Sequence, residues 1–174
     1  MKETAIFGGG CFWCTEGVFS ALKGVLSVEP GYSGGHIEHP SYEQVCSKES
    51  GHIEVVKIVY DPKQLSFTQL LDVFFHTHDP TTPDRQGADI GPQYASAIFC
   101  QDATQREQAF EAIELYQPEF SQPIITHILD NAVFWPAELE HHNYYARNPQ
   151  QGYCQMVVGP KVHAFKQRYQ SWLE

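Results

Sequence analysis

The chain has 174 residues, 42% of them hydrophobic and 13% aromatic, which is enough for the core of one domain and short for two. The 11 basic and 21 acidic residues give a net charge of −10, which argues against binding to nucleic acid or to an anionic membrane surface. No apolar run reaches the roughly 20 residues of a membrane span, and the start MKETAIFGGG lacks the apolar region of a secretory signal. We therefore expect one domain over residues 1–174, in the cytoplasm, with no membrane or nucleic acid partner.

Short strands and helices alternate along the first half of the chain. Apolar and β-branched runs predict strands at residues 4–8, 25–35 and 52–62. A helix is expected at 11–24, where Gly24 is the stop signal. Ser66 precedes Gln69 by three residues, the spacing of a capping box, which predicts a second helix over 66–79.

A long loop with Pro and Gly, residues 80–93, divides the chain, and long ordered loops are often functional. Beyond it we expect strands at 94–100 and 123–129, helices at 102–117, 136–148 and 160–173, and a loop at 149–159. The strands are few, and the connections are too irregular for repeated βαβ units. The pattern therefore predicts an α+β fold, a two-layer sandwich with a mixed sheet and an irregular C-terminal segment.

The stretch GGGCFWC at residues 8–14 carries the first candidate for chemistry. Cys11 follows a strand and three glycines at the first turn of a helix, where free N–H groups and the helix dipole favour the thiolate and lower the thiol pKa. The glycines let another molecule approach the backbone closely. We therefore interpret Cys11 as a nucleophile, against the commoner alternative of a small buried hydrophobic residue.

Cys11 and Cys14 together form a C-x-x-C pair, the spacing of dithiol redox sites and half of many zinc sites. Two alternatives follow: a general thiol–disulfide oxidoreductase that uses this pair, and a metal-binding module that adds some of the nine histidines. The chain has no second C-x-x-C and no H-E-x-x-H motif, so we expect no metal site.

Glu54 is a candidate general acid. Strand alternation puts it on one face with Val56 and Ile58, and apolar neighbours raise the pKa of a carboxyl toward the range that a general acid needs at neutral pH. The alternative is that Glu54 lies in solvent at the end of the strand, just after Gly51. The pattern alone leaves both open.

Cys154 lies in a stretch punctuated by Pro and Gly, which we expect to be mobile. A mobile cysteine far from a reactive one suits a resolving role, in which it attacks an oxidised partner and forms a disulfide. The odd number of cysteines, five, indicates free thiols in a reducing compartment. Tyr42 and Tyr94, in or beside loops, are candidate phenols for binding an oxygen atom.

Taken in order, these motifs resemble the signature segments of the A-type peptide methionine sulfoxide reductases. The segments are GGGCFWCTEGVF, GYSGG, HPSYEQVCS, GHIEVVKIVYDP, HDPTTPDRQGADIGPQY, and NPQQGYC followed by PKV. The resemblance covers nearly the whole chain. It implies a ferredoxin-like plait and the reduction of the S epimer of methionine sulfoxide, free or in peptides and proteins, as a repair of oxidised proteins.

The resemblance also implies residue roles. Cys11 attacks the sulfoxide sulfur and becomes a sulfenic acid, and Glu54 protonates the sulfoxide oxygen. Cys154 then forms a Cys11–Cys154 disulfide, which thioredoxin or another dithiol reduces, so no cofactor is needed and the protein is expected to act as a monomer. The substrate-binding residues implied are Tyr42 and Tyr94 for the sulfoxide oxygen, Phe12 and Trp13 for the methyl group, and Asp89 for the substrate backbone.

Three positions depart from the pattern of the family. Ala88 stands where the family has Asn, and Ala95 stands where it has Arg, which puts charge-assisted contacts near the site in doubt. Cys14 stands where many relatives have Gly, and it is an alternative disulfide partner for Cys11. We expect Cys154 as the partner, because residues within one helical turn often orient their sulfur atoms poorly for a disulfide.

Overall fold

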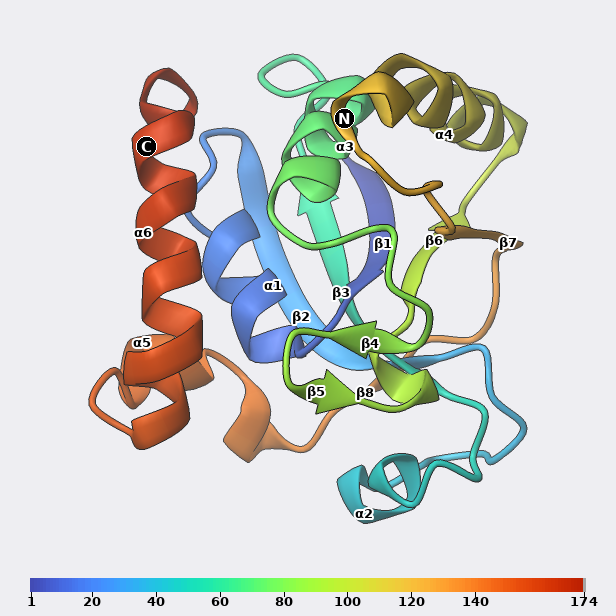
Figure 1. Ribbon diagram of the computed structural model, residues 1–174, viewed down its shortest axis with the longest axis vertical. Helices are drawn as coiled ribbons and strands as arrows, with labels where there is room; N and C mark the ends of the chain where they lie inside the picture. Colours follow the sequence, from blue (N-terminus) through green and yellow to red (C-terminus); the bar gives the residue numbers. More distant parts are fainter. Residues whose placement is uncertain (174) are drawn as a thin grey trace.

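The computed structural model describes residues 1–173, in which a six-stranded sheet is covered by helices (Figure 1). The strand order is β7-β6-β1-β3-β2-β8, and only the β6–β7 pair is parallel, so the predicted mixed sheet is confirmed. The strands are β1 Glu3–Gly9, β2 Val25–Ser33, β3 Ile53–Tyr60, β6 Ser96–Cys100, β7 His127–Asp130 and β8 Trp135–Pro136. A separate hairpin pairs β4 Arg85–Gln86 with β5 Asp89–Ile90.

The α-helices are α1 Phe12–Phe19, α2 Tyr42–Cys46, α3 Phe67–His76, α4 Ala103–Tyr116, α5 Tyr144–Arg147 and α6 Gly159–Arg168. The predicted capping box begins α3: Gln69 N–H donates to Ser66 Oγ at 3.1 Å, and Ser66 N–H donates to Gln69 Oε1 at 2.9 Å. A second capping box, Ser41 with Gln44, begins α2. Satisfied N–H groups at these starts explain why even a five-residue helix is formed at α2.

The main core lies between the sheet and the helices. Phe7 of β1 packs its ring 4.8 Å from that of Phe74 in α3 and 5.6 Å from that of Phe19 in α1. Each such fully buried ring contributes roughly 1.5–3 kcal/mol to folding. A smaller cluster of buried residues forms a second core, which holds Ile6, Ile53, Val55, Ala95, Ala97 and Phe99. The main core also holds Phe12 of α1 and Val56 of β3, so the start of α1 and the middle of β3 are fixed relative to one another.

Several predicted elements are wrong in extent. The strand expected at 123–129 is β7, His127–Asp130, and the loop expected at 80–93 contains the β4–β5 hairpin. The helix expected at 11–24 ends at Phe19, because Leu22 is fully buried and Lys23 N–H donates to Trp172 O, which draws this segment toward the C-terminus. The helix expected at 136–148 is broken by the left-handed backbone of Asn143, with φ 56°. Residues 149–159, expected as a loop, contain a π-helical turn, Cys154–Val158, which continues into α6.

Gly10 turns the chain from β1 into α1 with a φ of +95°. A Cβ there would lie 2.6 Å from Cγ of the buried Gln86, whose Oε1 accepts the N–H of Asp79 at 2.9 Å. We expect Gly10→Ala to lower the free energy of unfolding by about 1–3 kcal/mol through backbone strain, measured by urea denaturation. Gly152→Ala is the control, because nothing lies within 4 Å of its Cβ position. Equal unfolding midpoints for the two variants would contradict the prediction.

No helix within residues 1–173 combines the length and the apolar character needed to cross a membrane.

Candidate functional site

Cys11 is the N-cap residue of α1, half-buried, at the end of the glycine turn. The free N–H groups that sequence reasoning assigned to its thiol are mostly engaged elsewhere. Phe12 N–H donates to Glu54 Oε1 at 3.1 Å, and Cys14 N–H donates to Cys11 O at 3.1 Å. Of the groups at this helix start, the N–H of Trp13 is the backbone donor that favours the Cys11 thiolate.

The pKa of Cys11 is raised by its hydrogen bond with the Cys14 thiol and then by burial. This direction is opposite to the lowered pKa that the sequence predicted for this thiol. The reason is that backbone donors expected at the thiol are used by Glu54 and by the first turn of the helix. The thiolate is the nucleophilic form of a cysteine, so a thiol at this position has to lose its proton before it can attack.

Glu54 lies in β3, opposite Tyr32 of β2, with 1% of its surface exposed. Burial, and then the charge of Cys11, raises the pKa of this carboxyl well above its usual value, while the Phe12 N–H opposes the shift. Its second oxygen, Oε2, is buried and has no hydrogen-bond partner among residues 1–173. The buried alternative for Glu54 is confirmed, and the solvent-exposed alternative is wrong.

Tyr42 and Tyr94 both lie around Glu54. Burial, followed by the charge of Glu54, raises the pKa of each phenol, so both keep the proton that they need as hydrogen-bond donors. Tyr42 is the first residue of α2, where its N–H donates to Glu138 Oε2 at 2.9 Å. Tyr94 ends the 3₁₀ turn Pro92–Tyr94 that precedes β6. Two phenols that keep their protons are thus coupled electrostatically to Glu54.

Phe12 and Trp13 form an aromatic wall beside Cys11, but they differ in exposure. Phe12 is 1% exposed and lies 5.4 Å from the ring of His141, while Trp13 is only half-buried. Trp13 stacks on Tyr144 at 3.8 Å with an interplanar angle of 6°, and its Nε1–H donates to His141 Nδ1 at 3.2 Å. The wall is therefore completed from the C-terminal part of the chain.

The structure adds residues that sequence reasoning missed. They are Tyr32, Glu138, His141, Tyr144 and Tyr153. Tyr153 O–H donates to the Asp89 carboxylate and lies edge-on to Trp13, 5.8 Å between ring centroids. The available signal for Tyr153 was its position next to Cys154. Nothing in the spacing of the other four distinguishes them from ordinary core or surface residues.

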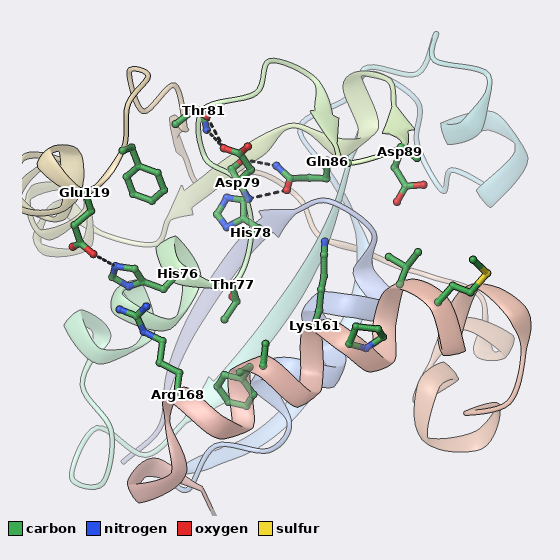
Figure 2. Close-up of a pocket in the computed structure, with 18 of the residues that line it drawn as sticks. His76, Thr77, His78, Asp79, Thr81, Gln86, Asp89, Glu119, Lys161 and Arg168 are labelled. Atoms are coloured by element: carbon green, nitrogen blue, oxygen red, sulfur yellow. Dashed lines mark hydrogen bonds and ion pairs between the residues drawn. The ribbon is translucent and has the colours of Figure 1, made fainter.

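Asp89 lies in the β4–β5 hairpin, at the edge of a cavity of about 1040 Å³ that runs between this loop and α6 (Figure 2). Tyr153 and Met156 line the same cavity, and Lys161 extends from α6 toward the loop that carries Asp79 and Gln86 (Figure 2). The structure therefore places Asp89 beside Tyr153 and on an open groove. Among residues 1–173, Asp89 is the one predicted site residue in the lining of this cavity, which does not include Cys11, Phe12, Trp13, Tyr42, Glu54, Tyr94 or Cys154.

Cys154 is fully buried at the first residue of the π-helical turn, and its N–H donates to Gln151 Oε1 at 3.0 Å. The expectation that it lies in a mobile loop is wrong, because this stretch is helical and packs into the main core with α1. Burial, and then the charge of Cys11, raises the pKa of the Cys154 thiol. All five cysteines are free in the structure.

One group of possible metal ligands is found within residues 1–173: Glu138, Glu140 and His141. Two of its members are already engaged. Glu138 accepts the O–H of Tyr32 at 3.0 Å as well as the N–H of Tyr42, and His141 Nδ1 accepts the Trp13 N–H. These groups position the aromatic wall. Within the same residues, Cys11 and Cys14 belong to no such group.

The two alanines that depart from the sequence pattern lie in different surroundings. Ala95 is 3% exposed and packs in the smaller core with Ile53 and Ala97. Ala88 is exposed at the cavity beside Asp89. The position of Ala95 therefore contributes packing rather than charge.

Comparison with known proteins gives a consistent result over nearly the whole chain. The family model described as "Peptide methionine sulfoxide reductase" matches residues 3–173. Peptide methionine sulfoxide reductase MsrA of Chromobacterium violaceum is 53% identical, with 99% of each chain covered. Methionine sulfoxide reductase A of Corynebacterium diphtheriae matches in structure with a TM-score of 0.83 at 35% identity, covering 86% of this chain and 76% of that one. Mxr1 of Saccharomyces cerevisiae in its reduced form matches with a TM-score of 0.80 at 30% identity, covering 88% and 89%.

Proposed function

The chain belongs to the peptide methionine sulfoxide reductase family and reduces methionine sulfoxide to methionine, and we propose that Cys11 is its nucleophile and Glu54 its general acid. The unpartnered Oε2 of Glu54 is the observation that supports these roles most directly. A buried carboxyl that keeps its proton and has one free oxygen can donate that proton to an incoming acceptor. A sulfoxide oxygen is such an acceptor.

The reaction begins when the sulfoxide oxygen accepts hydrogen bonds from Glu54, Tyr42 and Tyr94. Protonation or hydrogen bonding of that oxygen makes the sulfoxide sulfur electrophilic. The Cys11 sulfur then bonds to the sulfoxide sulfur, and the oxygen is transferred to Cys11 as methionine leaves. One thiol and one sulfoxide thus become one sulfenic acid and one thioether. Cys11 is oxidised, the substrate sulfur is reduced, and the thiol proton remains in the sulfenic acid.

The aromatic wall supplies the binding site for the methyl group of the substrate. Trp13 presents an indole held in place by Tyr144 and His141, and Phe12 closes the buried side. A rigid apolar surface binds a methyl group at little cost in conformational entropy. Asp89, at the mouth of the groove, accepts hydrogen bonds from the substrate backbone. Peptides and proteins with an exposed methionine sulfoxide are therefore the expected substrates, together with the free amino acid.

We assign the S epimer as the substrate, in accordance with the resemblance to A-type reductases. A chiral sulfur is distinguished when its oxygen, its methyl group and the attacking thiol all have fixed positions, as Glu54, Trp13 and Cys11 provide. The test is a single-turnover assay on the two separated epimers of a methionine sulfoxide peptide. We expect one methionine per chain from the S epimer and only the uncatalysed rate from R. Equal rates for the two epimers would overturn the assignment.

Cys154 is the resolving cysteine in this proposal, and its disulfide with Cys11 is reduced by thioredoxin or another external dithiol. This cycle needs no metal or organic cofactor. The odd number of cysteines, five, suits free thiols in a reducing compartment and supports a cytoplasmic site of action. All the site residues come from one chain, in keeping with a monomer. The order β6-β1-β3-β2, with α1 between β1 and β2 and α3 between β3 and β6, supports assignment of the central sheet to the ferredoxin-like plait.

A further inference from the structure

Cys14 lies where a residue of α1 can reach Cys11. Cys11 is the N-cap and Cys14 the third residue of the helix, the two positions whose side chains face each other in a capping box. Cys14 N–H donates to Cys11 O at 3.1 Å and so closes the first turn. A turn of this kind holds its end Cα atoms within about 7 Å, and disulfides span Cα distances of about 4.4–6.8 Å. The poor geometry expected within one helical turn does not apply, because the N-cap backbone of Cys11, with ψ 125°, is not helical.

Cys14 also lies on the face of α1 that contacts the turn carrying Cys154. Gly17 lies one helical turn further on. A Cβ atom added to Gly17 would lie 3.0 Å from Val162 Cγ2 of α6 and 3.9 Å from Val158 Cγ1 of the π-helical turn. Residues three apart in a helix share a face, so Cys14 faces the same way. Its side chain is 3% exposed. Cys14 therefore lies inside the protein on a face of α1 that turns toward α6, and it also lines a small cavity with Phe74 and His78.

The electrostatics of Cys14 suit a thiol that attacks and then leaves. Its pKa is lowered by the hydrogen bond with Cys11 and, against the effect of burial, by the Lys161 ammonium of α6. The thiolate is the attacking form in disulfide chemistry, and a thiol of lower pKa also leaves faster.

We propose that Cys14 is a first resolving cysteine, which attacks the Cys11 sulfenic acid and forms a Cys11–Cys14 disulfide before Cys154 takes part. This step rests on the proposed function, because it starts from the Cys11 sulfenic acid. The S–S bond forms as the S–O bond of Cys11 breaks, and the hydroxyl leaves as water with the proton of the Cys14 thiol. Cys154 then attacks the Cys11 sulfur and expels the Cys14 thiolate, which gives the Cys11–Cys154 disulfide and restores Cys14.

The test compares two variants, Cys154→Ser and Cys14→Ser/Cys154→Ser, in one turnover with an S-methionine sulfoxide peptide and no reductant. Dimedone is present to trap sulfenic acid. We expect Cys154→Ser to lose two thiols per methionine and to carry no dimedone, and the double variant to lose one thiol and carry dimedone on Cys11. Trypsin leaves Cys11 and Cys14 together in peptide 3–23, so the Cys11–Cys14 disulfide is read as a peptide lighter by two hydrogens.

The matched control is Cys100→Ala/Cys154→Ser, which removes a different buried thiol and is expected to behave as Cys154→Ser does. Equal dimedone labelling of Cys154→Ser and Cys14→Ser/Cys154→Ser, with methionine formed by both, would overturn the role of Cys14 and leave the proposed function intact. If folded protein of neither variant forms methionine, the proposed function fails as well. Far-UV circular dichroism establishes folding of each variant before the assay.

Discussion

Cys11→Ser is expected to lower kcat/KM for methionine sulfoxide on the order of 10³-fold or more, the range seen when a covalent nucleophile is removed. Serine keeps the shape of the N-cap and accepts the same contacts, but its hydroxyl is a far weaker nucleophile toward sulfur than a thiolate. Glu54, whose pKa is raised by burial, keeps its proton and so does not act as a base for this serine. The measurement is methionine formation with dithiothreitol as the reductant, so that the resolving steps do not limit the rate.

Cys100→Ala is the control for this variant. Cys100 ends β6, is buried, and has a pKa raised by burial to about 11, so it is an inert thiol. We expect its removal to leave kcat/KM unchanged. Retention of activity by Cys11→Ser at the level of Cys100→Ala would mean that another thiol attacks the substrate.

Glu54→Gln is expected to lower kcat about 10²- to 10⁴-fold, the usual contribution of a general acid. The amide keeps the shape and can still accept the Phe12 N–H, but it has no proton to give to the sulfoxide oxygen. In the wild-type protein, activity should fall as pH rises through the raised pKa of Glu54, because the proton donor is lost. This fall should be absent from the residual activity of Glu54→Gln. An unchanged pH profile in the variant would remove Glu54 as the acid.

The same substitution predicts an effect on stability with a definite sign. The pKa of Glu54 is higher in the folded than in the unfolded protein, so the stability that its proton confers is complete below the unfolded pKa of about 4.3. That stability is lost as pH rises through the folded pKa. Each pKa unit by which the folded and unfolded values differ changes the free energy of unfolding by about 1.4 kcal/mol. Urea denaturation across this pH range should show the loss in the wild type and not in Glu54→Gln, whatever the absolute stability of the variant.

Glu16→Gln is the matched control for activity, since Glu16 is also a buried carboxyl of the same region. Its Oε2 accepts the Asn143 N–H at 3.0 Å, and Gln can accept the same bond. We expect kcat to stay within about twofold of wild type, because exchanges that keep a hydrogen bond cost little. A loss as large as that in Glu54→Gln would show that removal of any buried carboxyl here disrupts the site.

The sequence was sufficient for most of the sheet, because its strands carry strong local patterns. The β-branched run at 52–62 became β3, and the Ser66–Gln69 pair became the start of α3. Alternation along β3 left the exposure of Glu54 undecided. Glu54 is buried because of its neighbours in space, above all the Phe12 N–H, and Phe12 lies 42 residues away along the chain.

The C-terminal third could not be predicted in the same way. The last helix was expected to begin at Pro160 and to run to residue 173, whereas α6 begins at Gly159 and ends at Arg168, with Pro160 in its first turn, where no N–H is needed. The preceding π-helical turn has no sequence signature of its own. The partners of Trp13 were missed for a related reason, since stacking on Tyr144 depends on the path of the chain through Asn143 and not on any local spacing.

The bond between the Trp13 indole and His141 joins residues 128 positions apart, and that between Asn143 and Glu16 joins residues 127 apart. Contacts of such separation form late in folding, because closing a long stretch of chain costs entropy before any contact repays it. During synthesis, the segment with Cys11 leaves the ribosome long before the residues that complete its aromatic wall. The proposed nucleophile is therefore made before its proposed binding site, and the aromatic wall is complete only when the end of the chain has been made and has folded back onto the beginning.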